Sequence, residues 1–449
     1  MTAQDVRLLL AAVLGVALAV VLILRGRLHP FFALLCGAFL VGAIAGQDPG
    51  ETANAIQKGV GDILGGTGLI VALGLSLGVM LQLSGGAASL AGSVLRLTGL
   101  AAAPWASLAA AMLVGLPLFF ETGLVLLMPV VGAALTALPG VVDRDRMRLR
   151  VMLPALAGLS VLHALVPPHP GPLLAISALG ANLGRTMIYG LVIAIPTAVI
   201  SGPLLAILIS RGVRITTPPV DAQAVALAKT PPIWASALVV LTPVVLIALG
   251  QFQGLLPTAS RADWAWISRF SSPVLALLFS NLIALPLLFG RAMTDGRIQE
   301  TVWAEAVKPA GAILLAIGAG GGLKQVLVSI GLSDLLARVA LHSSLSPLVL
   351  GWLVAVFVRL ATGSATVATI TAAGLMTKLV TTTGVSPEWM VLAIGSGSLF
   401  FSHVNDPGFW LVRGYLGTST AGAFRTWSVL ETVISIVGLV GVLCGSQLI

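Results

Sequence analysis

The sequence contains very little charge. Of its 449 residues only 9% are Asp, Glu, Lys or Arg, against about 25% in an ordinary soluble domain. Hydrophobic residues make up 57% of the chain. So few charges exclude a soluble globular fold, and we predict that the lipid bilayer is the solvent of this chain.

Cysteines and enzyme motifs are also scarce. The two cysteines, Cys36 and Cys444, have no CxxC or histidine spacing around them, which excludes a disulfide framework and a zinc site. HExxH and GxSxG motifs are absent, and the glycine-rich residues 318–322 lack the strand and the Lys-Ser/Thr ending of a phosphate loop. Close helix packing is the better interpretation of these glycines. We therefore expect no enzyme, no cofactor and no metal.

Basic residues outnumber acidic ones, for a net charge of +8. A nucleic-acid partner would need basic residues clustered on a soluble domain, and no segment of this sequence is polar enough to form one. Most Lys and Arg instead lie in short loops, where they set orientation and meet anionic lipid head groups. The expected partner is the bilayer and not a nucleic acid.

Long apolar runs fill most of the chain, and a membrane span takes about 20 such residues. Segments that fit are residues 6–24, 30–46, 63–83, 187–210, 233–250, 272–289, 311–330 and 426–444. A second group is too long for one span or is interrupted by Gly, Pro and polar residues, namely residues 105–138, 150–183, 347–376 and 389–416. We predict broken helices in this second group, whose freed backbone groups must line a cavity.

The order of these segments repeats. Three spans, two broken segments and a closing span occur in residues 1–210 and again in residues 233–449, joined by a cytoplasmic linker at residues 211–232. If the first broken segment of each half is a re-entrant hairpin, most of the 24 Lys and Arg fall on one side of the membrane. The predicted fold is an all-α polytopic membrane protein with two inverted-topology repeats. Each repeat has about five transmembrane crossings, one re-entrant helical hairpin and one broken helix.

The first broken segment of each half carries a charge near its centre. In the first half it is Glu121, which lies beside Thr122 and Gly123. In the second half it is Arg359, which precedes a short polar run. The members of that run are Thr362, Gly363, Ser364 and Thr366. A charge at the membrane centre costs at least about 2 to 3 kcal/mol, so both charges are expected to face a polar cavity.

These two charges predict different chemistry. Glu121 is a candidate proton carrier or cation ligand. Hydroxyls beside a glycine at a helix break can expose the N-terminus of a half-helix, where the dipole favours an anion. With Arg359 adjacent, this pattern predicts a carboxylate site, because a guanidinium can bind a carboxylate through two hydrogen bonds. An ion pair between Glu121 and Arg359 is the structural alternative, and it is compatible with both roles.

The second broken segments contain motifs that cannot be helical throughout. Residues 163–172 include four prolines within six positions, and the matching residues 402–408 include another proline. His169, Asn405 and Asp406 are expected to hydrogen-bond substrate hydroxyls, and Asp406 is a second candidate proton carrier. A lone histidine in an apolar stretch, such as His163, is more often structural.

Four long motifs resemble the gluconate permease family of the ion transporter superfamily. They are GLPLFFE at residues 115–121, HALVPPHPGP at 163–172, LATGSATVA at 360–368 and FSHVNDPGFW at 401–410. The resemblance covers essentially the whole chain. It implies a homodimeric proton symporter of the bacterial inner membrane that carries gluconate or a related sugar acid. The family also includes carriers of other small hydroxylated acids and of D-serine, so the substrate stays open within that group.

The predicted mechanism combines the motifs with the resemblance. Arg359 and residues 362–366 hold the substrate carboxylate, with Thr122 and Gly123 as the matching half-site, while His169, Asn405 and Asp406 meet its hydroxyls. Glu121 or Asp406 then takes the coupled proton. A sodium-coupled carrier of another small carboxylate or of D-serine is one alternative, since freed carbonyls also bind Na⁺. A channel is the alternative from another class of protein.

Overall fold

The computed structural model is helical almost throughout. The residues it describes are 2–26, 28–96, 102–116, 118–120, 123–124, 127–128, 131, 144–215, 230–255, 271–341, 345–403 and 406–448. Within them the one β-interaction is an isolated bridge between Ile215 and Thr418. The all-helical class predicted from the sequence is therefore confirmed.

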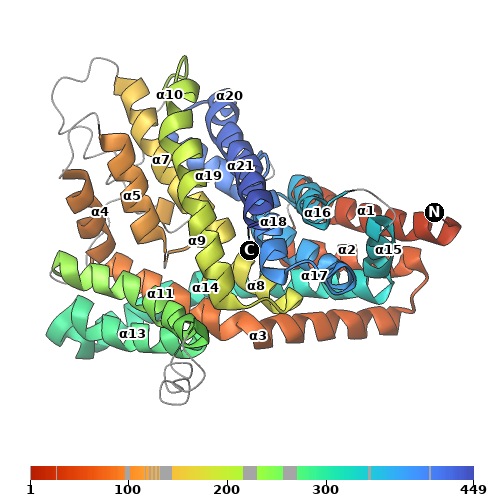
Figure 1. Cartoon of the computed structure of the whole chain (residues 1–449). Coiled ribbons are helices and arrows are strands. Elements are labelled where there is room, and N and C mark those ends of the chain that lie inside the picture. The colour runs from red at the N-terminus through yellow and green to blue at the C-terminus, as the bar shows by residue number, and fades with distance from the viewer. Residues whose placement is uncertain are drawn as a thin grey trace.

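In the first half, helices follow one another with short connections (Figure 1). They are α1 (Ala3–Leu24), α2 (Pro30–Ala45), α3 (Pro49–Leu83), α4 (Gly86–Arg96), α5 (Ala103–Gly115), α7 (Arg144–Leu165), α8 (Pro170–Leu179), α9 (Leu183–Val199), the π-helix η1 (Ile200–Leu204) and α10 (Leu205–Ile209).

The second half has a comparable series of helices. They are α11 (Ile233–Leu255), α13 (Pro273–Phe289), the 3-10 helix η3 (Gly290–Thr294), α14 (Gly296–Ser329), α15 (Leu332–Leu341), α16 (Pro347–Thr362), α17 (Ala365–Thr383), α18 (Pro387–Gly397), α19 (Pro407–Leu416), α20 (Thr420–Ala423), the π-helix η4 (Phe424–Ser428) and α21 (Val429–Gly445).

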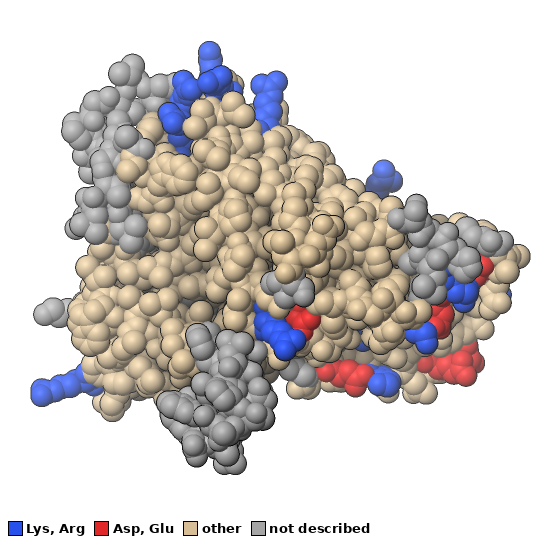
Figure 2. All heavy atoms as spheres, in the orientation of Figure 1, with Lys and Arg blue, Asp and Glu red and all other residues tan. Residues whose placement is uncertain are grey.

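Several helices can cross a membrane. Among the described residues, 5 helical stretches are long and apolar enough to span a bilayer, one of which runs from α7 into α8, or up to 6 with α3, whose two parts meet at 47°. In the view of Figure 2, Lys and Arg gather at one edge of the molecule, and acidic and basic residues mix along the opposite edge. The face between these edges is mostly uncharged, as the bilayer requires.

Two helices are longer than their predicted spans. The span expected at residues 63–83 lies in α3, which begins at Pro49, and the span expected at residues 311–330 lies in α14, which begins at Gly296. Each helix starts at an aspartate cap, since Asp48 accepts from the N–H of Gly50 and Asp295 accepts from that of Arg297. Hydropathy missed these starts because the first turns of both helices are polar.

Helices α3 and α14 pack directly on each other. A side chain on Gly59 would collide with the carbonyl oxygen of Gly321, and a side chain on Gly321 would collide with that of Gly59. The two backbones therefore touch, as small residues permit in membrane helix pairs. Close packing, predicted for residues 318–322, is confirmed at Gly321.

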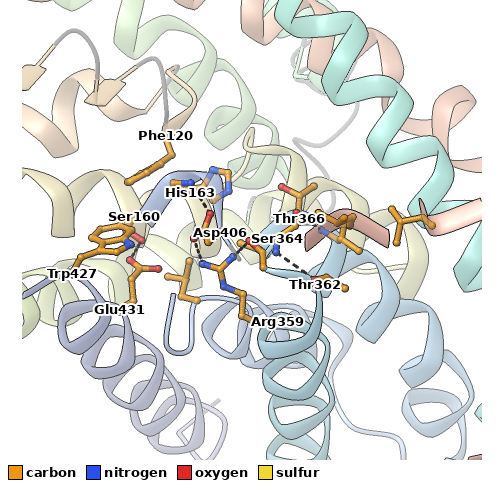
Figure 3. Close-up of a pocket in the computed structure, with 17 residues that line it drawn as sticks. Phe120, Ser160, His163, Arg359, Thr362, Ser364, Thr366, Asp406, Trp427 and Glu431 are labelled. Atoms are coloured by element: carbon orange, nitrogen blue, oxygen red, sulfur yellow. Dashed lines mark hydrogen bonds and ion pairs between the residues drawn. The ribbon is translucent and has the colours of Figure 1, made fainter. Parts of the chain in front are cut away.

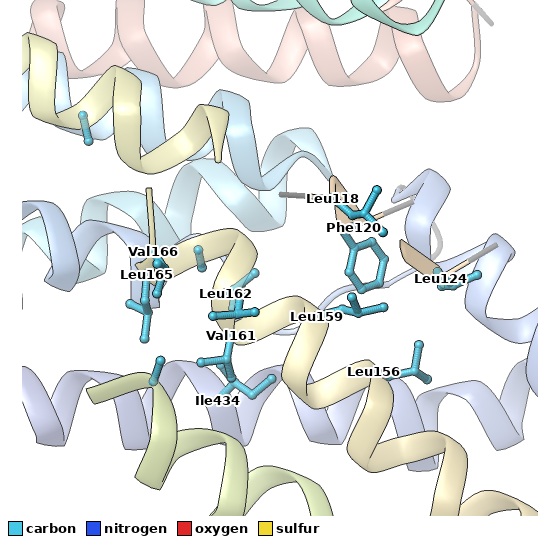
Figure 4. Close-up of a cluster of buried hydrophobic side chains, with 14 of the residues drawn as sticks. Leu118, Phe120, Leu124, Leu156, Leu159, Val161, Leu162, Leu165, Val166 and Ile434 are labelled. Carbon is cyan, nitrogen blue, oxygen red and sulfur yellow. The ribbon is translucent and has the colours of Figure 1, made fainter. Parts of the chain in front are cut away.

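Helix α7 is almost fully buried from Val151 onward and positions one side of the site. Its leucines and valines are buried, and Figure 4 shows Leu159 beside Phe120 and Val161 beside Ile434 of α21. On another side, Gly395 of α18 lies so close to the carbonyl oxygen of Ala164 that no side chain would fit. Packing this dense leaves α7 little freedom to shift.

Candidate functional site

The site begins at the break between α16 and α17. Gly363 closes α16 with φ of 69°, a left-handed conformation that glycine adopts without a steric penalty. Ser364 then caps α17, and its Oγ accepts from the N–H of Val367 at 3.3 Å. The predicted helix break thus lies at the predicted residues. The first N–H groups of α17 have no partner within the helix and face this break.

A second break faces the first. Helix α18 ends at Gly397 and α19 begins at Pro407, with Asp406 as its cap. One carboxylate oxygen of Asp406, Oδ1, accepts from the N–H of Gly408 at 2.7 Å. In the first half, α7 ends at Leu165 and α8 begins at Pro170.

Arg359 and Asp406 connect the two breaks. Arg359 Nη2 donates to Asp406 Oδ2 at 2.5 Å, and Arg359 Nη1 donates to the carbonyl oxygen of Gly363 at 2.6 Å. Only 3% of Arg359 is exposed. Its Nε is buried and has no hydrogen-bond partner among the residues that the structure describes. The Nε–H of this buried guanidinium is therefore among the donors that remain available.

The guanidinium lines a cavity of about 210 Å³ (Figure 3). The cavity is enclosed by α7, by both breaks, by α21 and by residues from α1 and α2. Six residues predicted for substrate or proton binding line it together. They are Arg359, Thr362, Gly363, Ser364, Thr366 and Asp406.

Other predicted residues are placed elsewhere or are not described. His169 is turned toward the end of α5, where its Nε2 lies 3.1 Å from the carbonyl oxygen of Gly115. Gly123 packs against the side chain of Leu159. Neither His169 nor Gly123 lines the cavity. Three predicted residues, Glu121, Thr122 and Asn405, lie outside the described residues.

Comparison with known proteins assigns this arrangement to a family. Residues 7–449 match the model of the GntP family permeases. The chain belongs to this permease family. Among its relatives, a gluconate permease of Pseudomonas aeruginosa is 42% identical over 98% of both chains. A high-affinity gluconate transporter of Escherichia coli K12 is 38% identical over 97% of this chain and 98% of its own.

Another relative has a different substrate in its name. The Gnt-II system L-idonate transporter of Escherichia coli K12 is 36% identical over 96% of this chain and 97% of its own. The fold is also shared with a solved structure, the YdaH transporter of Alcanivorax borkumensis, with a TM-score of 0.60 and 17% identity over 89% of both chains. The chain is thus a multi-pass membrane permease and not an enzyme.

The permease cavity also contains residues that the sequence reasoning missed. Glu431 of α21 lines it and is only 1% exposed. The carboxylate of Glu431 accepts a hydrogen bond from Ser160 Oγ of α7. Glu431 is the one acidic residue in the apolar residues 426–444, the same signal that selected Glu121. His163, which was expected to be structural, lines the cavity as well, and its Nδ1 has no partner among the described residues.

A chain of hydrogen bonds connects η4, which leads into α21, to the ion pair between Arg359 and Asp406. Trp427 Nε1 donates to Ser402 Oγ at 2.8 Å, and Ser402 Oγ donates to Asp406 Oδ2 at 2.5 Å. Ser428 Oγ donates to the carbonyl oxygen of Ser402 at 2.5 Å. Trp427 and Ser428 belong to the π-helix η4, a type of turn that is frequent at functional sites.

No three His, Cys, Asp or Glu side chains converge in the described part of the chain as a metal site built from these residue types would require. The cavity contains one guanidinium, two carboxylates and the hydroxyls of Thr362, Ser364 and Thr366 at the first break. The N–H groups at the start of α17 that have no partner within the helix lie beside them. This set matches a small anion that also carries hydroxyls.

Proposed function

We propose that this permease is a secondary active transporter that couples the uptake of gluconate, or of a related small sugar acid or hydroxy acid, to protons. Its location would be the bacterial inner membrane. The observation that carries the proposal is the unpartnered Nε of Arg359, buried in a cavity beside the N-terminus of α17. A buried donor without a partner costs free energy, and a substrate carboxylate would satisfy it.

The substrate carboxylate can bind without displacing Asp406. Two nitrogens of Arg359 are engaged by Asp406 and Gly363, and Nε is left for the ligand. The adjacent N–H groups of α17 add a partial positive charge on the same side of the cavity. Ser364 Oγ accepts from Val367, so its hydroxyl hydrogen is free to donate to a substrate oxygen.

Substrate hydroxyls have partners in the same cavity. Thr362 Oγ1 donates to the carbonyl oxygen of Val358 at 2.8 Å and keeps a lone pair for a ligand. Thr366 and His163 also line the cavity. The relatives named for gluconate and L-idonate transport support a sugar acid. His169 has no part in this proposal because its Nε2 is within hydrogen-bond distance of the carbonyl oxygen of Gly115.

The proposal includes an architecture of two inverted repeats, residues 1–210 and 233–449. Support comes from recurring elements, since α3 and α14 have 35 and 34 residues and a five-residue π-helix interrupts the closing helix of each half. Each repeat would have about five crossings. The α16–α17 pair would form the re-entrant hairpin, and α18–α19 the broken helix. The linker at residues 211–232 lies largely outside the described residues.

The oligomeric state belongs to the same proposal. We infer a homodimer from the family resemblance. The mass of the detergent-solubilised permease, measured by light scattering with the detergent subtracted, tests it, and a monomer at every protein concentration would contradict it.

Transport by purified permease in liposomes tests the function. Labelled gluconate should accumulate when the outside is acidic, and imposed Na⁺ gradients should not replace the proton gradient. Preloaded gluconate should accelerate uptake of the label, because counterflow requires a carrier and a channel does not produce it. Accumulation driven by Na⁺ alone, or the absence of counterflow, would contradict the proposal. L-Idonate, other C3 to C6 hydroxy acids and D-serine as competitors would rank the substrates.

A further inference from the structure

Glu431 is the buried acid of this cavity that neither the sequence motifs nor the family comparison assigns a role. We propose that Glu431, held by Ser160, is the group that carries the coupled proton. The inference rests on the proposed function of proton-coupled uptake, and it replaces Glu121 and Asp406 as the proton carrier.

The surroundings of Glu431 suit a group that exchanges a proton. Its carboxylate accepts from Ser160 Oγ, and no salt bridge to a basic side chain is formed within the described residues. In Figure 3 the carboxylate extends toward the side of the cavity where Arg359 lies. A carboxylate buried without an ion pair is costly, whereas its neutral form is not.

Asp406 is a poorer candidate because its oxygens are already engaged. It accepts from Arg359 Nη2, from Ser402 Oγ and from the N–H of Gly408. A proton on Asp406 would remove the ion pair and would weaken the cap of α19. Asp406 therefore suits the task of holding Arg359 in position.

Few charged groups surround Glu431. In the described cavity lining the titratable or charged neighbours are Arg359, Asp406 and His163. On α18 and α9, which pack on α21, the charged and titratable residues lie near its far end, where Trp389 packs at Gly445. They are Glu388, Arg185 and Tyr189. On α7 and η4, which also pack on α21, the remaining charged residues are Arg144, Asp145, Arg146, Arg148, Arg150 and Arg425, and those of α7 precede Ser160 by at least ten positions.

The formal charges explain how a proton would be coupled to substrate. Arg359 contributes one positive charge, which Asp406 balances. A substrate carboxylate that entered beside an ionised Glu431 would add a second uncompensated negative charge to an enclosed cavity. A proton on Glu431 removes that repulsion, so the substrate and the proton bind together.

The proton transfer is balanced. A proton from the outer solution bonds to a carboxylate oxygen of Glu431, which becomes neutral. The substrate anion then binds at Arg359. After the cavity opens inward, the substrate leaves and Glu431 releases the same proton to the cytoplasm. One proton and one monovalent anion move, so no net charge crosses the membrane.

The structure also provides a connection between the proton and the substrate site. Glu431 comes four positions after Trp427. Because η4 continues directly into α21, the two residues lie about one helical turn apart. Trp427 donates a hydrogen bond to Ser402, Ser402 donates one to Asp406, and Asp406 is paired with Arg359. A shift of α21 when Glu431 changes its charge would reach the ion pair through this chain.

Proton uptake on substrate binding tests the inference. Calorimetric titration of purified permease with gluconate, in buffers of different ionisation enthalpy, should show proton uptake that rises toward one proton per gluconate bound as the pH is raised, because burial favours the neutral form of Glu431 at lower pH. The Glu431→Gln variant, which mimics the protonated form, should bind gluconate with no proton uptake. In liposomes it should retain counterflow and lose accumulation driven by a pH gradient by more than tenfold.

Glu388→Gln is the matched control, since Glu388 is another buried glutamate but lies outside the cavity, and this variant should take up protons like the wild type. If Glu431→Gln still takes up one proton per gluconate, the inference is wrong. If the wild type itself takes up none at any pH, the proposed function is what fails.

A second variant covers the case in which Glu431→Gln does not fold. Ser160→Ala removes the donor that stabilises the ionised Glu431 and should raise the pH of half-maximal uptake by about one to two units, the size expected for one hydrogen bond to a charged group. Ser201→Ala, another buried serine, which bonds only within its own helix, should leave that pH unchanged. A Ser160→Ala profile equal to that of the wild type would overturn the inference.

Discussion

Arg359 and Asp406 are 47 positions apart in the sequence and form a buried ion pair between two helix breaks. Arg359 lies in the last turn of α16, and Asp406 caps α19. The pair holds the guanidinium in the lining of the cavity, and its Nε is buried without a hydrogen-bond partner among the described residues. It is also costly to form at membrane depth, because both charges lose their contact with water. Such a pair is expected where its position serves a ligand.

The geometry of the guanidinium predicts the effect of Arg359→Lys. Lysine keeps the positive charge but loses the Nε–H and the planar fork, so the carboxylate loses about one charge-assisted hydrogen bond, worth about 1.5 to 3 kcal/mol. We expect the Kd for gluconate to rise at least tenfold while the folded protein persists. Calorimetric titration measures this, with Arg185→Lys, an exposed arginine, as the control. An unchanged Kd would show that Arg359 does not bind substrate.

The ion pair itself predicts the effect of Asp406→Asn. The change leaves Arg359 as an uncompensated buried charge, which typically costs about 3 to 5 kcal/mol. The melting temperature of the purified variant should fall. Because a bound carboxylate would supply the missing negative charge, gluconate should raise the melting temperature of the variant more than that of the wild type. An equal rise in both proteins would contradict binding at Arg359.

The left-handed conformation of Gly363 predicts a graded effect of substitution. Gly363→Ala should destabilise the break by about 1 to 2 kcal/mol, the cost of this conformation for a residue with a Cβ atom. Gly363→Asn should cost less, because Asn adopts it more readily. Uptake rates and melting temperatures should follow the order glycine, asparagine, alanine. Gly414→Ala, in a helix with open space around it, should leave both quantities near the wild-type values.

The position of His169 predicts a structural effect without a binding effect. His169→Ala removes the contact with the carbonyl oxygen of Gly115 and leaves a buried acceptor unpaired, at a cost of about 1 to 3 kcal/mol. The melting temperature should fall, while the Kd for gluconate should stay within about twofold of the wild-type value. A large loss of affinity at unchanged melting temperature would show instead that His169 binds the substrate.

The backbone of the site could be predicted with some accuracy. The break after Thr362 and the start of α19 at Pro407 follow from local chemistry, because Gly363 permits a left-handed turn and a proline at a helix start needs no N–H partner. Helices α3 and α14 begin well before the spans predicted within them. Their first turns are polar, and a hydropathy pattern detects only the apolar part of a helix.

The sequence by itself determined the solvent, the helical class and the family of this protein, because low charge, long apolar runs and contiguous motifs are local properties. Only the tertiary structure decided which distant groups meet. It paired Arg359 with Asp406, turned His169 away from the cavity and brought Glu431 of α21 to Ser160 of α7. These contacts depend on how the helices pack against α7, and the spacing of residues along one chain does not specify that packing.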